Sequence, residues 1–98
     1  MTEAFVSAVL FGLLPENFER VSSEAAQFAQ GATPRIQGLI EIALLGNKER
    51  TRLLILSRWE SEDAWARSRW DQEVGKTMVE LIENAKTFSV ETFVPIRP

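Results

Sequence analysis

The side chains of this sequence that could do chemistry are few in kind. Its 98 residues contain no Cys, no Tyr and no His. A thiol nucleophile, the usual neutral-pH base and the commonest ligand of metals and haem are therefore missing. Carboxylates, Lys, Arg, Ser, Asn and Trp remain, so we expect a site with no metal and no cofactor.

Three tryptophans, Trp59, Trp65 and Trp70, lie close together in the sequence. Large aromatic side chains commonly pack in a core or between subunits, which is the simplest interpretation of each one. The alternative is that the three indoles, together with Phe18 and Phe28, line a flat hydrophobic slot for a planar aromatic ligand. The sequence leaves both interpretations open.

Ser7 and Arg58 are polar residues within apolar segments. The Ser7 hydroxyl can donate to a ligand if its face of the strand meets helices, and otherwise it lies in a subunit interface. Arg58 alternates with the leucines before it, so its charge needs a carboxylate such as Glu41 or Glu91. The alternative role of Arg58 is to bind an anionic substrate.

Asp71 and Glu73 are the carboxylates that could act as bases near the tryptophans. Both fall where a helix is expected to begin, and a solvated helix start commonly carries acidic residues because they favour the helix dipole. Capping and solvation are therefore the simpler interpretation of these two residues, and catalysis is the alternative.

The segment from Leu53 to Trp65 combines a strand with the start of a helix. Leu53 to Leu56 are four consecutive aliphatic residues, too few for a membrane span, so we expect a strand that is covered on both faces. This strand ends near Trp59. Ser61 then suits an N-cap, because acidic residues follow it where the helix dipole favours negative charge.

The residues before this segment predict one strand and one helix. Phe5 to Leu14 is apolar at nearly every position, which indicates a first strand buried on both faces. Pro15 suits the first position of a helix, and apolar residues then recur at three- and four-residue steps. We expect Gly31 to end this helix and the residues up to Pro34 to be extended, because a residue that precedes proline disfavours the helical region.

Two further strands and a second helical region complete the chain. Gly38 to Leu45 predicts a strand joined to the Leu53 strand by a polar hairpin turn. One face of this strand is expected to carry Ile40, Ile42 and Leu44. Asp71 can cap a continuation of the second helix. Apolar residues along that continuation are Val74, Met78, Leu81 and Ala85. Phe88 to Val94 alternates as a last strand.

The predicted order of strand, helix, strand, strand, helix and strand is that of an α+β, ferredoxin-like βαββαβ domain covering residues 1–98. Both helices then cover one face of a four-stranded antiparallel sheet. Apolar residues occupy both faces, and leaving five or six of them exposed would forfeit about 1.5–3 kcal/mol each. We therefore expect a homodimer in which a second sheet covers the open face, giving a dimeric α+β barrel.

The charge and the N-terminus exclude several kinds of partner. The net charge is −3 and the 11 basic residues are scattered, so nucleic acid is not an expected partner. No apolar run is long enough for a membrane span, and the N-terminus has no pattern of a signal peptide. A cytoplasmic location with no membrane partner is the expectation.

The segment Trp59-Glu60-Ser61-Glu62-Asp63-Ala64-Trp65 resembles the junction of third strand and second helix in the antibiotic biosynthesis monooxygenase family of the dimeric α+β barrel superfamily. The resemblance covers essentially the whole chain in the order and length of its elements. It implies oxidation of an aromatic polyketide-like substrate, such as an anthrone or a quinol, with no metal or flavin. In that mechanism a dry pocket stabilises the substrate anion, which reacts directly with O₂.

The resemblance also implies roles for individual residues. Trp59 matches the family's pocket tryptophan, and Trp65 takes the place of an active-site tyrosine, so these two are the expected catalytic residues. Ile55 stands where those enzymes have a pocket asparagine. Family members that degrade haem need a histidine near the position of Met78, so haem is not expected as a ligand.

The expected substrate-binding residues are Ser7, Phe18, Phe28, Ile55, Trp70 and Met78. A cofactor-independent monooxygenase of a small aromatic ligand is the leading hypothesis. Because the polar Tyr and Asn of the family are missing, the competing hypothesis is a non-catalytic module of the same fold that binds a small molecule or serves in assembly.

Overall fold

The computed structural model describes residues 4–96, which form a sheet with a layer of helices on one face. In chain order the elements are β1 (Phe5–Gly12), α1 (Pro15–Arg35), β2 (Leu39–Gly46), β3 (Arg52–Trp59), α2 (Glu62–Ser68), α3 (Gln72–Glu83) and β4 (Thr87–Phe93). The strands are antiparallel neighbours in the order β2-β3-β1-β4. The ferredoxin-like α+β fold predicted from the sequence is confirmed.

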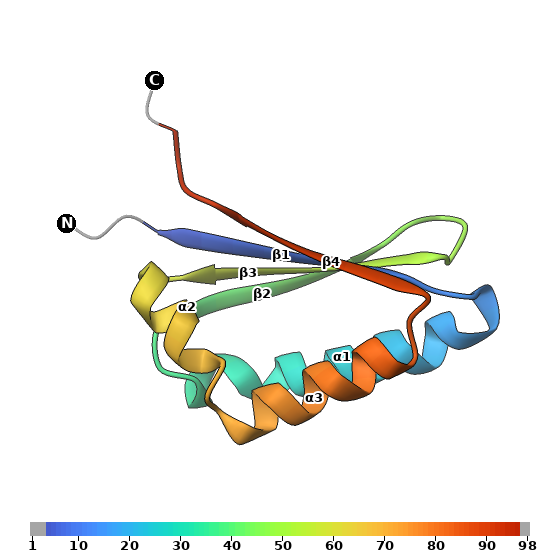
Figure 1. The fold of residues 1–98 in the computed structure, drawn as a ribbon, viewed down its shortest axis with the longest axis horizontal. Helices are drawn as coiled ribbons and strands as arrows, with labels where there is room; N and C mark the ends of the chain where they lie inside the picture. Colours follow the sequence, from blue (N-terminus) through green and yellow to red (C-terminus); the bar gives the residue numbers. More distant parts are fainter. Residues whose placement is uncertain (1–3, 97–98) are drawn as a thin grey trace.

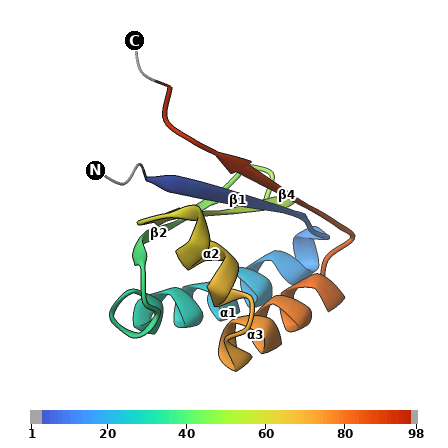
Figure 2. The ribbon, with the colours of Figure 1, turned by 60° about the vertical axis from the view of Figure 1, so that its left-hand side comes forward.

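Both long helices lie on the same side of the sheet (Figures 1 and 2), and α2 lies at one end of it. Alternation along β1 decides which side chains meet the helices. Phe5, Ser7, Val9 and Phe11 point to the helix layer and are buried. None of the helices within residues 4–96 is long and apolar enough to cross a membrane.

The buried face holds two apolar clusters. The central cluster consists of Val9, Phe11, Leu13, Val21, Ala25, Leu53 and Leu81. The α2-side cluster, at the end of the sheet where α2 begins, consists of Phe5, Ala32, Ile36, Leu39, Trp59 and Ala64. Since Trp59 belongs to the second cluster, the segment that resembles the monooxygenase family is anchored in the core.

Two polar caps divide the second helical region as the sequence predicts. The Ser61 hydroxyl accepts a hydrogen bond from the Ala64 backbone N–H at 3.1 Å, which starts α2. The Asp71 carboxylate accepts bonds from the N–H groups of Glu73 and Val74, both at 3.0 Å, which starts α3. Each cap satisfies N–H groups that have no partner within the helix.

The expected end of the first helix at Gly31 is wrong, because α1 continues to Arg35 with Pro34 inside its last turn. Burial explains the continuation. Ala32 and Ile36 are both buried in the α2-side cluster, and the Ile36 N–H donates to the Ala32 carbonyl at 2.8 Å. Packing of this turn against the sheet offsets the helix hydrogen bond that proline lacks.

The expected alternation along β2 is also wrong at its start. The pairing of β2 with β3 shifts register between Leu39 and Glu41, which is a β-bulge. Leu39 therefore faces the helices, as Ile42 does three positions later, while Ile40 is exposed. A bulge turns the side chains that precede it to the other face of the sheet.

The face of the sheet away from the helices remains open and apolar. In register across β1, β3 and β2 it carries two rows, Ala8–Leu56–Ala43 and Leu10–Leu54–Leu45. Arg58, which was expected to need a carboxylate partner, has one on this face. Its Nε lies 3.0 Å from Glu41 Oε1. These apolar residues are the reason why a homodimer is predicted from the sequence.

Candidate functional site

A cavity of about 170 Å³ lies between the sheet and the helices at the end where α2 begins. Every element contributes to its wall, including β4 through Val90. Six residues expected from the sequence line this cavity, namely Ser7, Phe28, Ile55, Trp59, Trp65 and Met78. The structure thus brings together residues from β1, α1, β3, α2 and α3.

Polar groups converge on this cavity although most of its wall is apolar. Within residues 4–96 the buried polar side chains are Ser7, Ser57 and Ser68, and all three line it. Ser57 and Ser68 were missed by the sequence analysis. A signal was available for Ser57, because it precedes Trp59 by two positions on a strand and so shares its face.

Ser7 and Ser57 lie opposite each other on neighbouring strands β1 and β3. The Trp59 indole N–H donates to Ser57 Oγ at 2.9 Å, so the proton of the Ser57 hydroxyl remains available to another acceptor. The Ser7 hydroxyl, 3% exposed as a residue, makes no hydrogen bond with the described part of the chain. Two hydroxyl donors therefore face the same apolar cavity.

Ser68 has a different function in the wall. Its hydroxyl donates to the carbonyl of Trp65, at 2.6 Å, within helix α2. That bond satisfies the donor of Ser68 inside the protein, so it holds the last turn of α2. The hydroxyls that can serve a ligand are then those of Ser7 and Ser57.

Trp59 and Trp65 form walls of the cavity in different ways. Trp59 is buried, and its single N–H donor is already used by Ser57. Trp65 packs at a tilt of 42° against Phe5, with ring centroids 5.3 Å apart. The Arg69 guanidinium lies 4.8 Å from the Trp65 ring centroid on α2 and also lines the cavity.

Phe18 and Trp70, expected in the same slot, lie elsewhere. Phe18 sits under Arg50, 5.4 Å from its guanidinium carbon, and against Gly46 at the far end of β2. Ten helical residues separate it from Phe28, about 15 Å along the axis, so the two rings cannot share a small cavity. Trp70 is 87% exposed, and it lies beyond the end of α2 in the turn that leads to α3.

Asp71 and Glu73 do not line the cavity. Arg35 pairs with both, at 3.4 Å to Asp71 and 2.8 Å to Glu73. The pKa of Asp71 lies below its ordinary value of 3.8, chiefly because the Val74 backbone N–H bonds its carboxylate, with the Arg35 charge adding to the effect. Asp71 is therefore a charged helix cap.

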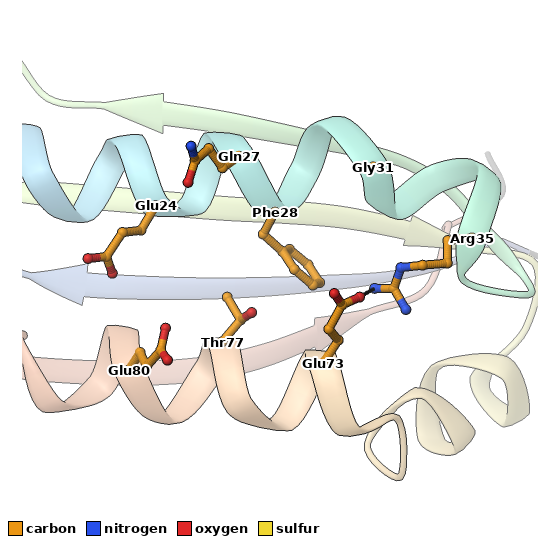
Figure 3. A pocket seen from close by; sticks show the side chains of 8 residues that line it. All are labelled: Glu24, Gln27, Phe28, Gly31, Arg35, Glu73, Thr77 and Glu80. Atoms are coloured by element: carbon orange, nitrogen blue, oxygen red, sulfur yellow. Dashed lines mark ion pairs between the residues drawn. The ribbon is translucent and has the colours of Figure 1, made fainter.

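A larger groove of about 450 Å³ runs between α1 and α3 on the outer surface (Figure 3). Figure 3 shows Glu24 on α1, Glu80 on α3 and the ion pair of Arg35 with Glu73 along it. Phe28 lines both this groove and the inner cavity. Since its charged groups are open to solvent, the groove offers less for recognition of an aromatic ligand than the inner cavity does.

No three side chains of His, Cys, Asp or Glu gather within residues 4–96 as they would around a metal ion. The donors in the cavity wall are hydroxyls, two indoles and a guanidinium. Such groups bind and orient anions or neutral oxygens, and they are poor ligands for a metal.

Comparison with solved structures finds the same fold in several bacterial proteins. A conserved protein of Bacteroides thetaiotaomicron, described as a possible oxidoreductase, has a TM-score of 0.84 at 15% identity over 96% of this chain and 99% of its own. A proposed antibiotic biosynthesis monooxygenase of Nitrosomonas europaea has a TM-score of 0.84 at 10% identity, over 100% and 95%. SnoaB, a cofactor-independent oxygenase of Streptomyces nogalater, has a TM-score of 0.76 at 18% identity, over 98% and 96%.

At these identities the likeness to solved structures shows the fold alone. No curated protein sequence matches the chain. The family model described as antibiotic biosynthesis monooxygenase matches residues 4–79, which include β1, the whole cavity wall except Val90, and the segment from Trp59 to Trp65. This chain therefore belongs to the antibiotic biosynthesis monooxygenase family.

Proposed function

We propose that the chain is a cofactor-independent monooxygenase that oxidises a small phenol or quinol with O₂. The observation that carries the proposal is the pair of buried hydroxyls, Ser7 and Ser57, facing an apolar cavity with indole walls. Membership of the monooxygenase family supports it. The fold is also that of SnoaB, which is a cofactor-independent oxygenase.

The size of the cavity favours a small substrate. An engineered cavity of about 150 Å³ in another protein holds one benzene ring, whereas drug-sized ligands occupy about 300–1,000 Å³. A volume of about 170 Å³ therefore encloses one aromatic ring, and a second ring reaches the mouth. We favour one- and two-ring phenols over the three-ring anthrones that the family resemblance implies.

The proposed oxidation requires that the cavity stabilise the phenolate of the substrate and exclude water. Hydrogen bonds from Ser7 and Ser57 favour the phenolate, and the apolar wall strengthens those bonds. The electron-rich ring passes one electron to O₂, and the two radicals couple to form a C–O bond. The peroxide takes up a proton and loses water as the ring C–H is removed, leaving a carbonyl. For 1-naphthol the sum is naphthol plus O₂ to 1,4-naphthoquinone plus water.

Oxygen uptake with 1-naphthol and with naphthohydroquinone tests the proposal. We expect uptake above buffer with the unaltered protein and a loss of about a hundredfold in kcat for Ser7→Ala combined with Ser57→Ala, since two donors to the anion are removed. Ser23→Ala, at an exposed serine of α1, is the matched control and keeps full activity. Uptake no faster than in buffer for both substrates contradicts the proposal.

A non-catalytic binding module is the second candidate function. The observation in its favour is that no carboxylate lines the cavity, so the described wall contains no base to take the phenol proton. Under this alternative the same phenols bind, which quenches or shifts tryptophan fluorescence, while oxygen uptake stays at the rate of buffer.

The homodimer is part of the same proposal. The open face carries apolar rows, one of which contains Leu10, Leu54 and Leu45. The same face of a second copy is apolar too, so the two sheets can pack against each other. Full burial of each large side chain contributes about 1.5–3 kcal/mol, and a two-fold axis doubles every contact. Closure of the two sheets also holds β1 and β3, the strands that carry the paired serines, in a fixed arrangement.

A further inference from the structure

Arg69 is the charged side chain on the described wall of the cavity. It follows the last residue of α2, and its own backbone is still helical. Its guanidinium lies 4.8 Å from the centroid of the Trp65 ring, within the range of a cation–π contact. Arg69 is exposed while Ser7 and Ser57 are buried, so the cation stands at the mouth of the cavity and the hydroxyls at its back.

The charge of Arg69 is not neutralised within residues 4–96. Arg35, Arg50 and Arg58 each pair with a carboxylate, whereas no carboxylate lies within 4.0 Å of Arg69. A guanidinium that stacks on an aromatic face keeps the N–H groups at its edge free to donate. The planar fork of those groups matches the two oxygens of a carboxylate.

We propose that the ligand of this cavity is an aromatic carboxylate with one or two rings, whose acid group binds Arg69 while its rings lie between the indoles. The inference rests on the proposed function for the location of the site and adds the charged group of the substrate. In this arrangement a ring hydroxyl meets Ser7 and Ser57, and the carboxylate at the other end fixes the orientation of the ring. Arg69 thus determines specificity.

Two ligands that differ in one group test this inference. 6-Hydroxy-2-naphthoate carries the carboxylate, and 6-hydroxy-2-naphthamide is its uncharged counterpart of nearly the same shape. Calorimetric titration under nitrogen measures binding without oxidation. We expect the unaltered protein to bind the carboxylate about ten- to a hundredfold more tightly than the amide, as charge-assisted hydrogen bonds do.

Arg69→Gln is expected to bring the carboxylate to the affinity of the amide while leaving the affinity of the amide unchanged. The unchanged amide value reports that the wall at Trp65 is intact. Arg67→Gln is the matched control, because Arg67 is an exposed arginine on the same short helix that does not line the cavity. This control keeps the preference for the carboxylate, and Arg69→Lys keeps only part of it because the fork is lost.

Equal affinity for the two ligands in the unaltered protein overturns the inference, and so does binding of neither. An equal loss of the preference in Arg67→Gln and Arg69→Gln also overturns it, since the effect is then one of general charge. The outcome is separable from the proposed function. Preference for the carboxylate without oxygen uptake defeats only the monooxygenase, whereas oxidation of neutral naphthol without that preference defeats only the role of Arg69.

Discussion

Gly38 and Ala64 meet at the entrance to the second helical region, where the chain has no room for a larger residue. Gly38 has φ +87°, in the left-handed region, and a Cβ added to it would overlap the Cβ of Ala64. Its carbonyl accepts from the Glu60 N–H at 2.8 Å, which fixes the peptide. This contact gives a structural reason for the small residue at position 64 in the segment that resembles the family.

We predict that Gly38→Ala lowers the free energy of unfolding by at least about 2 kcal/mol. An L-residue in the left-handed region costs about 1–2 kcal/mol, and the overlap with Ala64 adds to it. Guanidinium unfolding followed by tryptophan fluorescence measures the change. Gly75→Ala is the control, because Gly75 lies in helix α3 with no atom within 4 Å of the added methyl, so it gains up to about 1 kcal/mol. Equal effects at both glycines would contradict the argument.

Among single residues, the sequence predicted those whose neighbours are local and failed where distance along an element matters. Ser61 and Asp71 were identified as caps because the partners of a cap lie two or three residues away. Phe18 was grouped with Phe28 by type and helical spacing, although the length of α1 places Phe18 at the other end of the sheet. Composition shows which rings exist, and only the path of the chain shows which of them meet.

At the scale of elements, the cap of α3 connects stability with pH. The carboxylate form of Asp71 is the one that accepts hydrogen bonds from Val74 and Glu73 and pairs with Arg35. Its pKa in the folded protein therefore lies below the ordinary 3.8. A depressed pKa of this kind stabilises the fold above the ordinary value, and the stabilisation is lost as the pH falls through the folded pKa.

We expect the gap in unfolding free energy between the unaltered protein and Asp71→Ala to be constant from pH 7 to about pH 5 and to shrink below pH 3.8. Urea unfolding at fixed salt over this range measures it. Asp71→Asn keeps a capping oxygen that does not titrate, so its gap to Asp71→Ala stays level with pH. A gap that is just as wide at pH 2.5 as at pH 6 would show that the charge of Asp71 contributes nothing.

The elements themselves were predictable where one physical signal dominates. Strands rich in apolar and β-branched residues and helices with a polar face were found in the right order. Gly31 and Pro34 both signal an end of a helix, yet packing of Ala32 and Ile36 against the sheet carries α1 past them. The bulge between Leu39 and Glu41 could not be predicted from the sequence, because apolar residues on both faces of β2 fit either register.

At the scale of the whole molecule, the two faces of the sheet differ in what covers them. The helix-covered face contains the cavity, and two of its three buried hydroxyls, those of Ser7 and Ser57, come from strands at the centre of the sheet. The outer face consists of apolar rows flanked by the ion pair of Arg58 with Glu41. The sequence predicted both faces from the density of apolar residues, but the volume of the cavity and the position of Arg69 depend on how the helices pack.

A charge at the centre of the open face tests whether a second copy covers it. We predict that Leu10→Glu converts a dimer to single chains at low micromolar concentration, because closing the interface would take a carboxylate from each subunit out of water in place of an apolar contact. Sedimentation velocity measures the mass. Val79→Glu is the matched control: Val79 is 54% exposed on helix α3, on the other side of the molecule, so this change leaves the dimer intact. An unaltered protein that sediments as one chain would refute the dimer, and dimers of Leu10→Glu as stable as those of the control would place the contact on another surface.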